Sequence, residues 1–253
     1  MRVLALLLGL SLAVSGCHHA SEASTTEVTI AAAASMRLAM PDLMGAFSKD
    51  HEGVRLTVSY GASGDLRQQV EGGAPIDVVV FASPKPVDDL IKARLVDAAT
   101  RTVIATNSLV LVGPRGGKPY TFLSIETVPV SEKIAIGDPK SVPAGQYAKA
   151  ALEKLGKWDA VEGHVVFGGD VTAVLAYARR GEVSAAVVYK TDVHGIADVV
   201  VLDELRGDVA PRIEDVAGVT TATKSAGEAK AFVQFLGSAA GRKILDAYGF
   251  GGA

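Results

Sequence analysis

Four points along the chain join the end of a predicted strand to a helix start made of small or hydroxyl-bearing residues. First-turn N–H groups of a helix have no intrahelical partner and carry the positive end of the helix dipole. None of these junctions includes Lys or Arg, so together they could surround a small anion with neutral donors. The junctions are 33–36 (Ala-Ala-Ser-Met), 60–64 (Tyr-Gly-Ala-Ser-Gly), 143–145 (Pro-Ala-Gly) and 167–171 (Phe-Gly-Gly-Asp-Val).

Three side chains at or near these junctions could contribute further donors. Ser35 and Ser63 carry hydroxyls, although each is also a good helix N-cap. Tyr189 ends an apolar strand, where its ring would lie at the core edge and its phenol could donate one hydrogen bond. Asp170 is expected to cap its helix, because a carboxylate facing a bound anion would repel it. Taken singly, each junction is equally an ordinary strand–helix connection.

The elements that must position these residues alternate between strands and helices. Continuous apolar strands such as 77–81 are typical of parallel sheets covered on both faces by helices. The repeated strand–helix pattern predicts an α/β fold. The predicted strands are 28–32, 55–60, 77–81, 108–113, 134–136, 164–167, 185–189 and 199–202, and the predicted helices are 36–47, 66–71, 87–95, 147–155, 171–178, 228–236 and 242–248.

Length and charge limit the class of protein. The 253 residues, 49% of them hydrophobic, are enough for one large domain or two modest ones. The net charge is −3, with acidic and basic residues interspersed, so there is no basic stripe for a nucleic acid. No nucleic-acid partner is expected.

The N-terminus has the pattern of a secretory signal. Arg2 precedes an apolar run, 3–14, that is too short to span a membrane, and small residues then lead to Cys17. This ending resembles the lipobox of bacterial lipoproteins, in which the cysteine is lipidated and becomes the mature N-terminus. The resemblance implies a signal peptide at 1–17 and a polar tether at 18–27. The alternative is an ordinary cleaved signal with an incidental thiol.

Several kinds of catalytic or cofactor site are excluded by spacing. A phosphate loop fails because Pro119 follows Lys118 and Val112 lies where the first glycine is required. A nucleophile elbow fails at 61–65, where the second glycine comes one position early. The five histidines lack metal-ligand spacing, and one cysteine cannot form a thiolate cluster. No catalytic residue, cofactor or resident metal is therefore predicted.

Several motifs together resemble the molybdate-binding proteins of bacterial molybdate ABC transporters. The resemblance covers about residues 28–250, and its most specific part is Gly-Asp-Pro at 137–139 followed by Val-Pro-Ala-Gly. The other motifs are Ala-Ala-Ala-Ala-Ser at 31–35, Tyr-Gly-Ala-Ser at 60–63, Gly-Gly-Ala-Pro-Ile-Asp at 72–77, Gln-Tyr-Ala-Lys at 146–149, Asp-Val at 170–171, Val-Tyr at 188–189 and Tyr-Gly-Phe at 248–250.

This resemblance implies a two-lobe periplasmic binding protein of type II. Each lobe would be a mainly parallel sheet flanked by helices, with two hinge crossings near 105–108 and 215–219. Lobe 1 would comprise 28–106 and 217–253, and lobe 2 would comprise 107–216. Ligand would bind in the cleft and close the lobes by a hinge motion.

The resemblance also implies the ligand contacts. The hydroxyls of Ser35, Ser63 and Tyr189 and the N–H groups of Ala144 and Val171 would hold molybdate or tungstate as an intact oxyanion, with no direct bond to the metal. The family often has a serine-rich run after the second strand, and this chain lacks that run. Auxiliary hydroxyl contacts are therefore not expected there.

The expected protein is a non-enzymatic monomer, lipid-anchored on the periplasmic or cell-surface side of the bacterial membrane. Its expected partners are an ABC permease and the ATPase of that transporter. Two alternatives stay open at this point: a binding protein for sulfate or another oxyanion, and a secreted α/β hydrolase.

Overall fold

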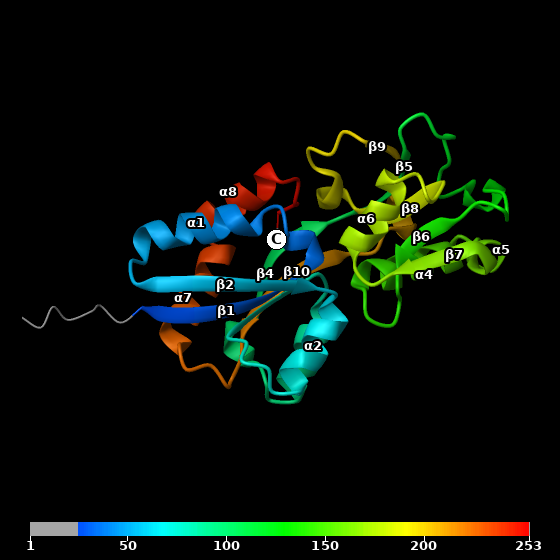
Figure 1. Cartoon of the computed structure of the whole chain (residues 1–253). Helices are drawn as coiled ribbons and strands as arrows, with labels where there is room; N and C mark the ends of the chain where they lie inside the picture. The colour runs from blue at the N-terminus through cyan, green and yellow to red at the C-terminus, as the bar shows by residue number, and fades with distance from the viewer. Residues whose placement is uncertain (1–24, 253) are drawn as a thin grey trace, which may run out of the picture.

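The computed structural model describes residues 25–252, which form two lobes side by side (Figure 1). The predicted signal peptide, Cys17 and residues 18–24 of the predicted tether lie outside the described residues. Strand β1 begins at Thr26, so the last two residues of the predicted tether belong to a strand. Within the described residues, no helix is both long and apolar enough to cross a membrane.

The first lobe is built on a sheet with the strand order β2-β1-β3-β10-β4. Its strands are β1 (Thr26–Ala33), β2 (Val54–Gly61), β3 (Val78–Phe81), β4 (Thr102–Asn107) and β10 (Ile213–Val219). β1 pairs in parallel with β2 and β3, whereas β10 is antiparallel to both β3 and β4. Four strands therefore run in one direction and β10 runs in the other.

The second lobe repeats this arrangement with the order β7-β6-β8-β5-β9. Its strands are β5 (Leu109–Pro114), β6 (Ile134–Gly137), β7 (Val165–Gly168), β8 (Ala185–Tyr189) and β9 (Val199–Glu204). Here β5 is the reversed strand, antiparallel to both β8 and β9. The prediction of two mainly parallel sheets in a two-lobe α/β protein is confirmed.

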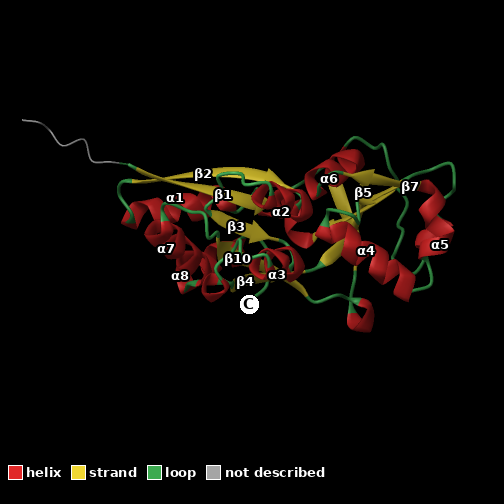
Figure 2. Cartoon of the chain, turned by 90° about the horizontal axis from the view of Figure 1, so that it is seen from below, coloured by secondary structure: helices red, strands yellow, loops and turns green. Residues whose placement is uncertain are grey.

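Helices cover both faces of each sheet (Figure 2). The α-helices are α1 (Met40–Asp50), α2 (Ser63–Glu71), α3 (Pro84–Lys92), α4 (Pro143–Lys154), α5 (Trp158–Val161), α6 (Val171–Arg179), α7 (Ala226–Gly237) and α8 (Ala239–Ala247). In the first lobe, Ile30 of β1 packs with α1, α7 and α8, while its neighbour Ala31 packs with α2 and α3 on the opposite face. Short 3-10 turns are η1 (Ala34–Met36), η2 (Ala98–Thr100), η3 (Ile125–Thr127), η4 (Glu162–His164), η5 (Lys190–Val193) and η6 (Gly207–Val209).

The chain passes between the lobes twice. β4 leads through Ser108 into β5, and residues 205–212 lead from β9 into β10. In both sheets the reversed strand is therefore the one that enters from the other lobe. The predicted lobe boundaries stay a prediction, although strand pairing already places β10 in the first sheet from Ile213 onwards.

Four elements differ from the sequence-based expectation. The sequence patterns do not predict β4 and β10, because both strands mix polar residues into their apolar positions. The short α5 is not predicted either. The helix expected over 36–47 divides into η1 and α1, and Pro41 lies at the start of α1, where its missing N–H costs nothing.

Candidate functional site

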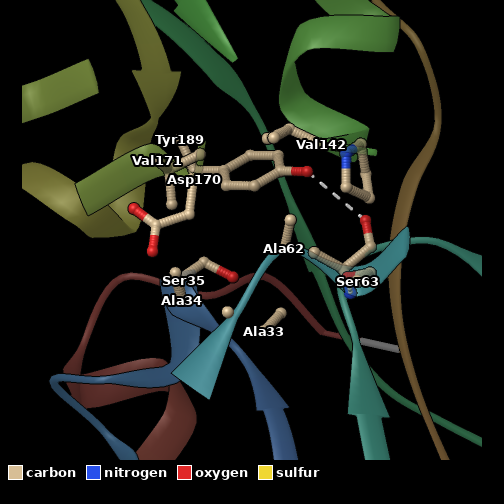
Figure 3. A pocket seen from close by; sticks show the side chains of 12 residues that line it. Ala33, Ala34, Ser35, Ala62, Ser63, Val142, Asp170, Val171 and Tyr189 are labelled. Carbon is tan, nitrogen blue, oxygen red and sulfur yellow. Dashed lines mark hydrogen bonds between the residues drawn. The ribbon is translucent and has the colours of Figure 1, made fainter. Parts of the chain in front are cut away.

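A narrow pocket lies where strand ends and helix starts of the two lobes meet (Figure 3). Its cavity volume of about 10 Å³ is far smaller than the roughly 300–1,000 Å³ of pockets for drug-sized ligands. Among the described residues, those lining it include no Lys or Arg. They are Ala33, Ala34, Ser35, Gly61, Ala62, Ser63, Ala82, Val142, Pro143, Asp170, Val171 and Tyr189.

Four of the five predicted ligand residues line this pocket. They are Ser35, Ser63, Val171 and Tyr189. The fifth, Ala144, is fully buried directly after the lining residue Pro143, in the first turn of α4. All four strand–helix junctions singled out in the sequence therefore meet at one place.

The two serines do not cap helices. Ser35 lies inside η1, and its buried Oγ has no hydrogen-bond partner among residues 25–252. Ser63 is the first residue of α2, after the N-cap Ala62, and its Oγ accepts the N–H of Ala82 at 3.1 Å. Because that bond uses the oxygen as acceptor, the Ser63 hydroxyl hydrogen can still donate. The capping alternative for these serines is wrong, and both hydroxyls are available to a ligand.

Tyr189 presents a neutral phenol to the pocket. The side chain is 1% exposed, and its hydroxyl donates to the Ala82 carbonyl oxygen at 3.4 Å (Figure 3), a long and weak bond that an anion could replace. Burial, and then the charge of Asp215, raise the pKa of the Tyr189 hydroxyl well above 10.0. The phenol therefore keeps its proton and acts as a donor.

Asp170 caps α6, as predicted, by accepting the Ala173 N–H at 2.8 Å. It also lines the pocket, and within the described part of the chain it is the one carboxylate that does so. The pocket is therefore not a ring of donors alone, as the five predicted positions would make it.

Glycines bring the start of α4 against the end of β6. A Cβ on Gly145 would lie 1.9 Å from the Gly137 carbonyl oxygen, and a Cβ on Gly137 would lie 2.4 Å from Cγ1 of Val142. Neither position has room for a side chain. This packing accounts for the two glycines, Gly137 and Gly145, of the Gly-Asp-Pro and Val-Pro-Ala-Gly motif. The Asp138 carboxylate accepts the Lys140 N–H at 2.9 Å, so it shapes the turn and is not among the lining residues.

Two buried carboxyls behind Tyr189 are not predicted by the sequence. Asp215 is 0% exposed at an irregular position of β10, and neither of its oxygens has a partner within residues 25–252. Burial, and then the charge of Asp192, raise the pKa of Asp215 to about 8. Burial, and then the charge of Asp170, raise the pKa of Asp192 to about 7, against the effect of the Tyr189 N–H that it accepts at 2.8 Å.

The only sequence signal for these two carboxyls is an acidic residue inside an apolar strand or beside one. Asp215 lies close to the pocket wall, because the next residue, Val216, pairs with Phe81 immediately before the lining residue Ala82. An ionised Asp215 would therefore oppose an anion in the pocket.

Comparison with known proteins finds relatives that match nearly the whole chain. Residues 28–251 match the pattern of the bacterial extracellular solute-binding proteins. The chain is 37% identical to YvgL, described as an ABC transporter substrate-binding lipoprotein of Bacillus subtilis, over 94% of this chain and 93% of that protein. It is 35% identical to the molybdate-binding protein ModA of Escherichia coli, over 95% of this chain and 94% of ModA.

Solved structures resemble it as a whole. The substrate-binding domain of a molybdenum ABC transporter from Clostridium difficile is 32% identical, with a TM-score of 0.67 over 90% of this chain and 99% of that chain. The periplasmic molybdate-binding protein of Azotobacter vinelandii, at 21% identity, shares the fold with a TM-score of 0.76 over 88% of this chain and 98% of that chain.

Proposed function

This chain belongs to the family of bacterial extracellular solute-binding proteins, and we propose that its solute is molybdate or tungstate, captured as an intact oxyanion between the lobes. It is a ModA-like substrate-binding protein of an ABC transporter and not an enzyme. Its small molecule is accordingly a transported ligand and not a cofactor, and its partners are the permease and ATPase components of a transporter.

The observation that carries the proposal is the availability of neutral donors at the pocket. Ser35 Oγ lies unpartnered in the described structure, the Ser63 hydroxyl hydrogen is unused, and Tyr189 makes one long bond. The first turns of α4 and α6 add the N–H groups of Ala144 and Val171, which have no intrahelical carbonyl to bind. Tetrahedral dianions can accept hydrogen bonds at every oxygen.

Selection among anions should follow from protonation and size. Molybdate, tungstate and sulfate are fully deprotonated near neutral pH, whereas phosphate keeps a proton that finds no acceptor among the five proposed donors, at a cost of about 1–3 kcal/mol. Sulfate has shorter bonds to oxygen and should reach fewer donors in a pocket sized for molybdate. We expect molybdate and tungstate to bind most tightly, then sulfate, then phosphate.

Competition calorimetry on residues 25–253 at neutral pH tests this order. The expected result is a molybdate dissociation constant at least about tenfold below that of phosphate, as a difference of 1.4 kcal/mol requires. If phosphate binds as tightly as molybdate, the proposed ligand class is wrong, and Asp170 would be the acceptor for the phosphate proton.

We propose further that the protein is a monomer, anchored through a lipid on Cys17, and that its closed form delivers the anion to the permease. The relative YvgL is described as a lipoprotein, which supports the anchor. The lobes are proposed as 28–106 with 217–253 for lobe 1, and 107–216 for lobe 2, except that β10 pairs in the first sheet from Ile213 and so belongs to lobe 1. Hinge crossings of this kind allow the lobes to open for ligand entry and release.

A further inference from the structure

Gly64 makes a main-chain contact with the opposite lobe. As the second residue of α2, it donates its N–H to the carbonyl oxygen of Ser141 at 2.9 Å. Ser141 lies in the turn between β6 and α4 of the second lobe. Their chain neighbours Ser63 and Val142 both line the pocket, so this contact lies at the pocket rim.

The second lobe leaves no space for a side chain at position 64. A Cβ on Gly64 would lie 2.6 Å from the Ser141 carbonyl oxygen, 2.8 Å from its Cα and 3.1 Å from its carbonyl carbon. All three are backbone atoms and cannot turn aside as a side chain would. The substitution therefore requires the two lobes to move apart.

The conformation of Gly64 itself does not require glycine. Its φ lies outside the left-handed region, and it belongs to a helix, where alanine is intrinsically more favourable than glycine. The close approach of Ser141 is thus the feature of the structure that calls for glycine. By comparison, the contact between the Tyr189 hydroxyl and Ala82 across the same pocket is longer, at 3.4 Å.

We propose that Gly64 is a closure residue, whose missing side chain lets the Ser141 carbonyl dock on the first turn of α2 and hold the lobes shut over a bound anion. Gly64 acts as a positioning residue, since the docking fixes how far apart Ser63 and Val142 lie in the pocket that both line. This inference rests on the proposed function, because it assigns the contact to retention of the anion.

Gly64→Ala tests the proposal, and Gly45→Ala is its matched control. Gly45 also lies in a helix, α1, but a Cβ there would have nothing within 4 Å. Both variants gain the helix preference of alanine, so neither should unfold more easily than wild type without anion. We expect Gly64→Ala to bind molybdate about tenfold or more weakly, and Gly45→Ala to bind within about twofold of wild type. Small-angle scattering should show compaction by molybdate in wild type and Gly45→Ala, but less in Gly64→Ala.

The double variant Gly64→Ala/Ser141→Gly tests whether the obstacle is the backbone. Because the contacted atoms belong to the main chain, removing the Ser141 side chain should not restore affinity, and restoration would overturn the proposed docking. Gly64→Ala binding within twofold of wild type would overturn the closure role, as would destabilisation of that variant without anion. If folded wild type binds no oxyanion, the proposed function is wrong and the closure role falls with it.

Discussion

At the scale of single residues, the pocket depends on hydroxyls that the fold leaves free. Replacing Tyr189 by Phe removes one donor while keeping the buried ring, so the fold should persist. We expect molybdate binding to weaken by about 1.5–3 kcal/mol, the value of a hydrogen bond to a charged group. Titration calorimetry measures this loss, and denaturant unfolding without anion serves as the control. Unchanged affinity would remove Tyr189 from the ligand set.

Asp170 offers a second test at this scale, because its carboxylate both caps α6 and adds negative charge to the pocket. Asp170→Asn retains a good capping side chain and removes the charge, so it should strengthen molybdate binding at little cost in stability. Asp170→Ala removes the cap as well and should cost about 1 kcal/mol of unfolding free energy. Weaker molybdate binding by Asp170→Asn, measured by calorimetry, would mean that the carboxylate supports the site.

At the scale of elements, β10 carries a buried carboxyl whose titration should control stability. The pKa of Asp215 is raised to about 8 in the folded protein from an ordinary 3.8. Between these values the folded protein holds a proton that the unfolded chain has released. The stability that this protonation contributes is therefore fully present below pH 3.8 and is lost as the pH rises through about 8. Between these pH values the free energy of unfolding falls by up to about 1.4 kcal/mol per pH unit.

Asp215→Asn should reduce this pH dependence and make the protein more stable than wild type near the upper end of the window. Urea unfolding at several pH values across the window measures both effects. Some slope will remain, because burial also raises the pKa of Asp192, to about 7, and its contribution has the same sign. Asp192→Asn is the control for that part. An Asp215→Asn profile identical to wild type would show that Asp215 is ionised in the folded protein.

The strands β8 and β10 show where prediction from the sequence succeeds and where it fails. β8 is predicted with its observed bounds because its apolar run is continuous, and the junctions at Ser35 and Ser63 are recognisable because each signal is local. β10 is not predicted, since Glu214 and Asp215 interrupt its pattern and only pairing with β3 and β4 makes it a strand. The place of Asp170 in the pocket wall, the contact of Gly64 with the other lobe and the burial of Asp215 depend on tertiary packing, which no local pattern contains.

At the scale of the whole molecule, the proposed anchor should decide where the protein is found. If Cys17 is lipidated, native protein should fractionate with membranes, and Cys17→Ser should release it as a soluble protein. Fractionation followed by immunoblotting measures the distribution, with a substitution of the exposed Lys49 as a control for expression. Wild-type protein found free of membranes in a bacterial host that processes lipoproteins would exclude the anchor.

The two sheets also differ in how soon a growing chain can complete them. Every strand of the second sheet lies between residues 109 and 204, whereas in the first sheet β10 lies between β3 and β4 and follows the whole second lobe along the chain. β4 therefore has no neighbouring strand in its own sheet until more than a hundred residues after it have been made. Such distant pairing is slow to form. The first lobe, which starts the chain, is thus the last to be finished during synthesis, and β3 and β4 keep unpaired edges in the meantime.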